Sequence, residues 1–377
     1  MARVQRKGML DSNMQGAPAV FSGDYPGWRI ATAFCGLLVP FLSGCASEPI
    51  LSYEGDAPAQ ILSPIQAAGV KDGRARFREI FCERFDAIGA PKDGRPACAD
   101  YLHRLADEPA ASRQAVRPRI PLSSIRFVVV PGFMGDATPG GMRVLGPSIA
   151  RLAEMGYQIE YLQVSGGGGG GYNADQIAAH FRDRAFPENE MLVVIGYSKG
   201  AIDLLHFLTG NPEFARRVDA MVSYSGAVNG SPLAEVFPEL VVEMGLAIAG
   251  GAAGDKGGYK ALKPSVQMPW LASHPPPAHI KYFSTASFTD RENVSAILAD
   301  GHDRLSQINP KNDGQLIFYD QILPGSTLLG YANGDHWAVA LPFTEKATGF
   351  ASTIATRNVF PRDAMFEAVL LFVRENL

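Results

Sequence analysis

The sequence predicts an α/β fold in which a mostly parallel β-sheet carries helices on both faces. From residue 125 onward, short apolar runs rich in Val and Ile alternate with segments whose apolar residues recur at helical spacing. A parallel sheet requires such alternation, because each strand returns to the same edge through a covering helix. The run 126–132, RFVVVPG, is the clearest strand, since a continuous β-branched stretch fits a strand that is buried on both faces.

Composition and charge restrict the class of protein. At 377 residues, with 46% hydrophobic and 19% charged residues, the chain is long enough for one large core with additions. The formal net charge is -4, and no run of Lys and Arg alternates with aromatic residues. Because phosphate backbones attract a basic surface, these features argue against a nucleic-acid partner.

The first 45 residues have the pattern of a secretion signal. Residues 30–44 are uncharged and apolar but too short to span a bilayer comfortably, and Arg29 precedes them. The segment ends in LSGC (42–45), which resembles the bacterial lipobox. That resemblance implies that Cys45 is lipidated and anchors the mature protein in the bacterial cell envelope, at the outer membrane or facing the periplasm. A cleaved ordinary signal and an uncleaved anchor are the alternatives.

Two short regions separate the signal from the predicted sheet. Residues 46–65 are rich in Ala, Pro, Ser and Glu, and we expect them to tether the folded body to the membrane. Residues 66–118 carry apolar residues at helical spacing on either side of a turn-rich stretch, which predicts a small N-terminal extension of two short helices. Because the leader before the apolar run is long, translation could also begin at Met9 or Met14.

The cysteines predict one disulfide. Cys35 lies in the signal and Cys45 is the lipidation candidate, which leaves Cys82 and Cys98 as an even pair in an oxidising compartment. A bond between them would close a short loop between the two predicted helices. Two reduced thiols are the alternative.

The remaining strands and helices follow in order along residues 119–377, the predicted sheet domain. Period-2 or continuous apolar patterns predict the strands, and apolar residues three or four positions apart predict the helices. The further predicted strands are 157–164, 191–197, 218–226, 279–288 and 326–332. The predicted helices are 146–156, 174–181 and 362–377, the last with Pro361 at its start.

Two segments interrupt this alternation. Residues 229–278 are far longer than an ordinary crossover, and their apolar stretch 233–253 predicts either a lid over the site or a cap helix buried on the sheet. Residues 166–171 are all glycine and satisfy GxGxxG trivially. No acidic residue ends a following strand about 20 residues on, so we expect a mobile loop here rather than a dinucleotide site.

The motif GYSKG at residues 196–200 is the strongest functional signal in the sequence. It follows the apolar strand MLVVI and precedes AIDLLHFL, in which apolar residues recur on one helical face. A sharp turn from strand to helix holds a Ser in a strained conformation and exposes its hydroxyl for nucleophilic attack. Gly196 and Gly200 leave room for the chain to cross. Ser198 is therefore the predicted nucleophile, against the alternative of a buried structural Ser.

At this motif, residues 125–377 resemble the α/β-hydrolase superfamily, in particular its bacterial lipases and esterases. The resemblance implies an oxyanion hole formed by the backbone N–H groups of Phe133 and Lys199. The loop PGFMG stands where lipases place HGxxG, with Pro131 where His is common, and Tyr197 also replaces a common His. A plain turn at the end of the strand is the alternative for this loop.

The superfamily order of nucleophile, acid and base places the base near the C-terminus. His336, in NGDHWAVA directly after the last predicted strand, fits this position, and His302 is its rival. For the acid, Asp313 lies in an NDG turn that resembles the acid turn of bacterial lipases, and Asp290 at a strand end competes with it. Asp335 is adjacent to His336 and therefore poorly placed to reach its ring.

These residues together predict a serine hydrolase of the lipase or esterase kind, which cleaves a carboxylic ester through an acyl-enzyme on Ser198. A polyester depolymerase, a thioesterase or an amidase would use the same residues, and a non-catalytic envelope module with this fold is an alternative of another class. The sequence contains no HExxH, EF-hand loop or CxxC, so no metal or other cofactor is predicted. The predicted partners are a small-molecule or lipid ester and, through the anchor, the membrane.

Overall fold

The computed structural model describes residues 69–92, 94–105, 108–111, 120–133, 135–136, 143–184, 186–236, 254–342 and 359–377. The predicted signal, Cys45 and the tether lie outside these residues, as does 237–253 of the predicted insertion. The chain divides into the units Met1–Ser47 and Glu48–Leu377, and every element below belongs to the second unit. Within the described ranges, none of the helices has the length and apolar character needed to cross a membrane.

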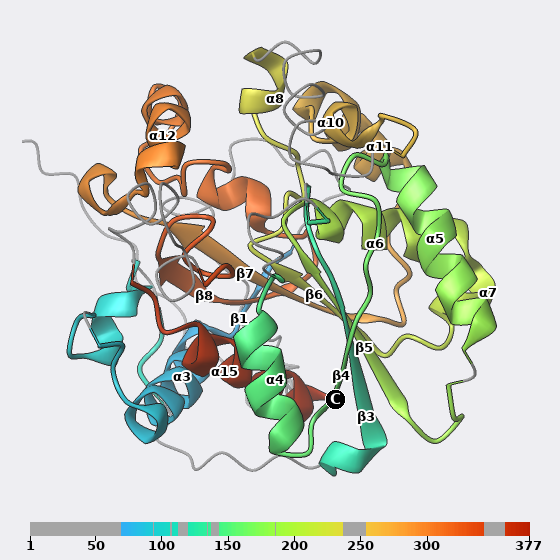
Figure 1. Cartoon of the computed structure of the whole chain (residues 1–377), viewed down its shortest axis with the longest axis horizontal. Helices are drawn as coiled ribbons and strands as arrows, with labels where there is room; N and C mark the ends of the chain where they lie inside the picture. Colours follow the sequence, from blue (N-terminus) through green and yellow to red (C-terminus); the bar gives the residue numbers. More distant parts are fainter. Residues whose placement is uncertain are drawn as a thin grey trace, which may run out of the picture. The chain divides into compact units, whose positions relative to one another are not determined.

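A mostly parallel β-sheet forms the centre of this second unit (Figure 1), which confirms the predicted fold class. The strands run in the order β1-β8-β7-β6-β5-β3-β4, and each neighbouring pair in this order is parallel. The additional strand β2 pairs with β8 in the antiparallel direction. The strands are β1 (Lys71–Asp72), β2 (Leu102–His103), β3 (Ile125–Val130), β4 (Gln158–Tyr161), β5 (Met191–Tyr197), β6 (Ala220–Tyr224), β7 (Lys281–Phe288) and β8 (Thr327–Asn333).

Helices of varied length connect these strands. The helices of eight or more residues are α3 (Arg74–Ile88), α4 (Gly146–Glu154), α5 (Gly170–Asp183), α6 (Lys199–Gly210), α11 (Pro264–Ser273), α12 (Ala299–Ser306) and α15 (Arg362–Asn376). The short α-helices are α7 (Pro212–Ala215), α8 (Leu233–Val236) and α10 (Gly258–Ala261). The 3-10 helices are η1 (Cys98–Tyr101), η2 (Leu122–Ser124), η4 (Arg291–Asn293), η5 (Ala296–Leu298) and η6 (Phe318–Gln321).

The longer helices cover both faces of the sheet (Figure 1). Phe127 and Val129 of β3 belong to the buried cluster that includes side chains of α3, α4 and α15. Val128 and Val130 belong to a second cluster, which includes side chains of α5 and α6. Successive side chains of a strand point to opposite faces, so two covering layers require the continuous apolar run that the sequence has here.

The segment before β3 is tied directly to strand β8. The disulfide between Cys82 and Cys98, which the sequence predicts, joins α3 to η1. Strands β1 and β2 lie on either side of this pair in the sequence, and both hydrogen-bond to β8. The sequence predicted helices alone in this region. Each of the two strands has only two residues, too few to produce a recognisable pattern.

The glycine run is closely packed, contrary to the expected mobile loop. Residues 165–170 are buried, and α5 begins within the run. Gly258 N–H donates to Gly167 O at 2.9 Å, and Gly169 N–H donates to the Asp255 carboxylate at 2.7 Å. Two backbones can approach this closely because the glycines have no side chains, so the run provides close packing rather than flexibility. For the predicted insertion as a whole, the lid and the buried cap both remain predictions.

Candidate active site

Ser198 occupies the sharp turn between β5 and α6. Its backbone has φ 55° and ψ -127°, outside the regions that L-residues ordinarily occupy. A Cβ atom at Gly196 would lie 2.5 Å from the backbone N of Ala201, and one at Gly200 would lie 2.4 Å from Val130 O. Only glycine fits at these two positions, which is why the motif requires both.

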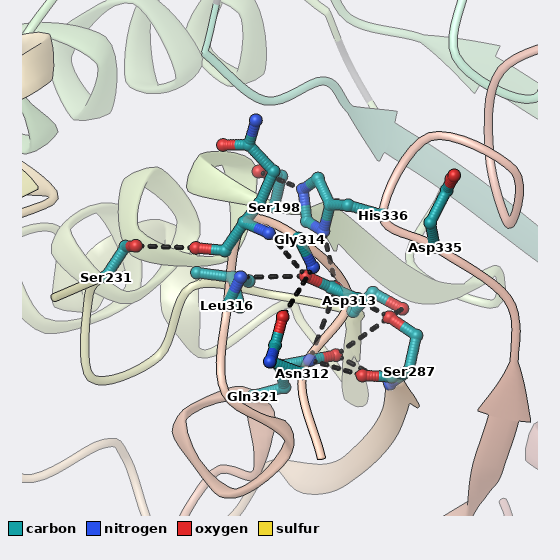
Figure 2. A network of polar contacts seen from close by, with 12 residues as sticks. Ser198, Ser231, Ser287, Asn312, Asp313, Gly314, Leu316, Gln321, Asp335 and His336 are labelled. Carbon is teal, nitrogen blue, oxygen red and sulfur yellow. Dashed lines mark hydrogen bonds and ion pairs between the residues drawn. The ribbon is translucent and has the colours of Figure 1, made fainter. Parts of the chain in front are cut away.

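The side chains of Ser198, His336 and Asp313 form one hydrogen-bonded line (Figure 2). His336 Nε2 lies 2.9 Å from Ser198 Oγ, and His336 Nδ1 lies 2.8 Å from Asp313 Oδ2. Asp313 is 0% exposed and His336 is 4% exposed. An imidazole held between a carboxylate and a hydroxyl can accept the hydroxyl proton, while the carboxylate fixes its tautomer.

Hydrogen-bond donors surround the Asp313 carboxylate (Figure 2). Oδ1 accepts the backbone N–H groups of Gln315 at 3.0 Å and Leu316 at 2.7 Å. Oδ2 accepts the hydroxyl of Ser287 at 2.7 Å and the side-chain amide of Gln321 at 3.3 Å, in addition to its contact with the imidazole. Such donors replace the hydrogen bonds to water that a buried carboxylate has lost.

Tyr197, the residue before Ser198, supports the loop that carries the histidine. Its hydroxyl donates to His336 O at 2.7 Å, and the two rings stack with centroids 5.1 Å apart. Burial raises the pKa of Tyr197 well above its ordinary value of 10.0, and the charges of Asp313 and Asp335 raise it further. The hydroxyl therefore stays protonated and remains a donor. The sequence marked Tyr197 only as a departure from the family pattern.

The rival residues do not contact Ser198 or His336 through their side chains in the hydrogen bonds of the described residues. Asp290 is exposed at the start of η4, and His302 is buried in α12, where Nε2 lies 3.1 Å from a backbone carbonyl oxygen. Asp335 accepts two backbone N–H groups, each at 2.7 Å, and thereby stabilises the loop that contains His336. No group of His, Cys, Asp and Glu side chains in the described part of the chain is arranged to hold a metal ion.

The two predicted oxyanion residues lie beside the nucleophile. Lys199 is the first residue of α6, and the first N–H groups of a helix have no acceptor within it. Gly132 passes so near Ser198 that a Cβ atom there would lie 2.6 Å from Ser198 Cβ and 3.1 Å from its Oγ. Phe133 follows Gly132 directly. One of the two predicted donors therefore directly follows the nucleophile, and the other lies on a separate segment that passes beside it; their role as an oxyanion hole stays a prediction.

The side chain of Lys199 forms a buried ion pair that the sequence analysis missed. Its Nζ lies 2.6 Å from Asp203 Oδ1, and both side chains are 1% exposed. The other carboxylate oxygen of Asp203 accepts the amide of Asn173 at 2.9 Å, and the same amide donates to Ser165 O. Burial raises the pKa of Asp203, and Lys199 partly offsets this effect. The spacing of four residues on a predicted helix was the available signal.

Comparison with curated proteins gives only a local match. No family model matches the sequence. The UDP-N-acetylmuramoyl-L-alanyl-D-glutamate--2,6-diaminopimelate ligase of Brucella melitensis biotype 1 is 35% identical over 72 residues, which are 19% of this chain and 14% of the ligase. The match thus spans a small part of both proteins, and nothing about ligase activity follows from it.

Comparison with solved structures covers most of the chain. The metagenomic carboxyl esterase MGS0156 is 35% identical with a TM-score of 0.76, over 85% of this chain and 97% of that one. EstA from Clostridium botulinum shares the fold at 14% identity and a TM-score of 0.51, over 80% of this chain and 98% of its own. An identity of 35% along nearly the whole of a solved carboxyl esterase goes beyond a shared fold. The chain belongs to the α/β-hydrolase superfamily, as a relative of carboxyl esterases.

Proposed function

We propose that the protein is a serine hydrolase that cleaves carboxylic esters through an acyl-enzyme on Ser198. The observation that carries this proposal is the hydrogen-bonded line from Ser198 through His336 to Asp313 at the end of β5. The strained backbone of Ser198 and the relation to a carboxyl esterase support the same reaction class.

In the first half of the reaction, Ser198 Oγ attacks the carbonyl carbon of the ester and its proton moves to His336 Nε2. The N–H groups of Phe133 and Lys199 donate to the negative oxygen of the tetrahedral intermediate. The bond to the alcohol oxygen then breaks, and His336 returns the proton to that leaving oxygen. Asp313 stabilises the imidazolium while it exists.

In the second half, water replaces the alcohol. His336 removes a proton from the water as it attacks the acyl carbon, and a second tetrahedral intermediate forms in the same oxyanion site. Its collapse releases the carboxylic acid and returns the proton to Ser198 Oγ.

A fluorophosphonate probe and a nitrophenyl ester test this proposal. We expect the wild type to be labelled and to hydrolyse the ester, and we expect Ser198→Ala to lose both properties. Ser273→Ala, which removes an exposed hydroxyl on α11, is the matched control and should keep both. A Ser198→Ala variant with unchanged ester hydrolysis would overturn the mechanism, and an unreactive wild type would favour the non-catalytic envelope module.

We further propose that Cys45 carries a lipid that anchors the protein in the bacterial cell envelope. The support is the LSGC sequence at the end of an apolar run of signal length. After expression in a bacterial host, we expect the protein in the membrane fraction with a fatty-acyl label, and Cys45→Ser without that label. Labelling of the Cys45→Ser variant at the wild-type level would contradict the anchor.

A further inference from the structure

The N-terminal extension meets the central sheet close to the candidate active site. Its strand β2 pairs with β8 in the antiparallel direction. Strand β8 ends at Asn333, and His336 follows three residues later. The inference below rests on the proposed ester hydrolysis, because it concerns the contacts that hold the predicted base and acid in place.

Asn333 is hydrogen-bonded to the extension and to the end of β7 at the same time. Its side-chain N–H donates to Asp100 O at 2.9 Å, and its backbone O accepts the guanidinium of Arg95 at 3.0 Å. Its side-chain O accepts the hydroxyl of Thr289 at 2.8 Å. Turning the amide over would place its oxygen against the Asp100 carbonyl oxygen, so these partners hold the amide in one orientation.

Thr289 continues this contact to the predicted acid. It is 1% exposed, and it lies two residues after Ser287, which donates to Asp313. Its backbone N–H donates to Asn312 O at 3.2 Å, in the NDG turn that contains Asp313. A chain of hydrogen bonds therefore joins Asn333, just before the base, to the turn of the acid.

The part of the extension that contacts Asn333 has strong contacts of its own. Cys98, which begins η1, is bonded to Cys82 of α3. The Tyr101 ring at the end of η1 is 0% exposed, and the Arg95 guanidinium lies over it at 4.5 Å from the centroid. A covalent bond and a buried ring therefore fix both groups of the extension that contact Asn333.

A third hydrogen bond of the extension reaches β7. His103 Nε2 lies 3.0 Å from Phe288 O, and the two rings stack with centroids 3.9 Å apart. Burial lowers the pKa of His103, so the ring is neutral at neutral pH and its Nε2 carries the proton that this carbonyl accepts. Phe288 follows Ser287 directly. The extension therefore contacts β7 and β8 at the ends that adjoin the predicted acid and base.

We propose that Asn333 is a positioning residue for His336 and Asp313, and that segment 95–103 of the extension holds Asn333 in place. Asn333 acts on the reaction through the imidazole that moves the protons and the carboxylate that orients it. A general acid or base must lie within hydrogen-bond reach of the proton that it transfers. Loss of the Asn333 contacts therefore slows proton transfer.

Two esters of the same acid separate a positioning role from a merely structural one. Nitrophenolate leaves as a stable anion, whereas the alkoxide of an ethyl ester needs the proton that His336 returns. A poorly placed imidazole should therefore lower kcat/KM for ethyl butanoate more than for nitrophenyl butanoate. A loss of folded protein would lower both values equally.

Asn333→Leu keeps the approximate size of the side chain and removes both contacts of the amide. We expect kcat/KM, per site titrated with a fluorophosphonate, to fall about tenfold for the nitrophenyl ester and roughly 100-fold for the ethyl ester. The loss is partial because Tyr197 and Asp335 hold the same loop from other sides.

Arg95→Met removes the second contact of the extension at a partly exposed loop position. We expect kcat/KM to fall about threefold further for the ethyl ester than for the nitrophenyl ester, since one hydrogen bond is lost. Arg104→Met is the matched control, because Arg104 is an exposed arginine of the same extension that pairs with Glu108 at 3.5 Å. It should leave both values unchanged.

The outcomes are distinguishable. If hydrolysis depends on Ser198 but Asn333→Leu lowers both values equally, or neither, the positioning role is wrong and ester hydrolysis stands. Hydrolysis that persists in Ser198→Ala, or a wild type that cleaves neither ester, would instead overturn the proposed function. If Asn333→Leu does not fold, Arg95→Met decides: equal losses for the two esters, or none, would contradict the positioning role.

Discussion

Ser198 is supported on two sides by different kinds of polar interaction. On the helix side, the Lys199–Asp203 ion pair joins the start of α6 to Asn173 of α5. On the strand side, the Asp313 carboxylate is surrounded by backbone N–H groups, the Ser287 hydroxyl and an amide. The helix side therefore contains a charge that is already neutralised by a cation, and the strand side contains a charge stabilised by neutral donors.

This difference matches the roles of the two carboxylates, Asp203 in the turn and Asp313 beside His336. Lys199 already neutralises the buried carboxylate of Asp203, so the pair can fix the backbone of the turn but does not take part in a proton transfer at Ser198. The hydrogen-bond partners of Asp313 among the described residues include no Lys or Arg, so the imidazolium of His336 is the cation that this carboxylate meets during the reaction. A fixed cation beside Asp313 would weaken that interaction, because it would compete for the same charge.

The largest expected effect comes from removing the charge on the strand side. In Asp313→Asn, the amide keeps the size of the side chain but presents the wrong partner to His336 Nδ1, so kcat should fall roughly 10⁴-fold. Steady-state hydrolysis of a nitrophenyl ester measures this fall. Asp303→Asn makes the same change at an exposed residue and should retain activity. A loss of less than tenfold in Asp313→Asn would mean that Asp313 does not orient the imidazole.

The second-largest expected effect is on the free energy of unfolding, and it concerns the Lys199–Asp203 ion pair. Lys199→Met leaves Asp203 buried without its cation, which should lower the free energy of unfolding by about 3 to 5 kcal/mol. Replacing both residues, as Lys199→Met with Asp203→Leu, removes the unpaired charge and should recover most of that loss. Urea unfolding of the two variants measures both values. Equal losses in the single and double variants would show that the pair is not held by charge.

A third buried carboxylate, Asp320, has no cation among its hydrogen-bond partners in the described residues and accepts only one neutral donor. Asp320 accepts one amide hydrogen bond from Asn229 at 3.2 Å, and burial raises its pKa from 3.8 to about 7. Between these two values the unfolded chain is ionised while the folded protein keeps the proton. The folded state therefore loses stability as the pH rises from about 4 to about 7, by at most roughly 4 kcal/mol.

Asp320→Asn should abolish this loss. The difference in unfolding free energy between variant and wild type should be small near pH 4 and should grow in favour of the variant up to about pH 7. Urea unfolding at a series of pH values measures it. A difference that does not change with pH would contradict the protonation of Asp320 in the folded protein.

The sequence predicted the strand side of the site better than the helix side. Strands β3 and β5 and the turn at Ser198 follow from continuous apolar runs and a glycine-bracketed motif, which are local signals. Asp313 and His336 were found from their order along the chain, which the superfamily supplied. Lys199 was considered only for its backbone N–H, because nothing in a five-residue motif reveals that a charged side chain is completely buried.

The residues that support the Asp313 carboxylate were not predicted, because they contact it from segments that are distant in the sequence. Ser287 reaches Asp313 from the end of β7, and Gln321 reaches it from η6, so neither role follows from sequence spacing. The glycine run was misread for a similar reason. Consecutive glycines permit either motion or close backbone contact, and the choice depends on Asp255 and Gly258, which lie more than 80 positions further along the chain.

The smallest expected effect shows whether Ser287 stabilises the charge of Asp313 or only the strand β7. Ser287→Ala removes one hydroxyl from the Asp313 carboxylate, and hydrogen bonds to charged groups contribute about 1.5 to 3 kcal/mol. Because Gln321 and two backbone N–H groups remain, we expect kcat to fall about tenfold with little change in KM. Ser284→Ala is the matched control, because Ser284 is a buried serine on the same strand whose hydroxyl contacts Ser326 instead. If the two variants lose kcat equally, Ser287 stabilises the strand and not the charge of Asp313.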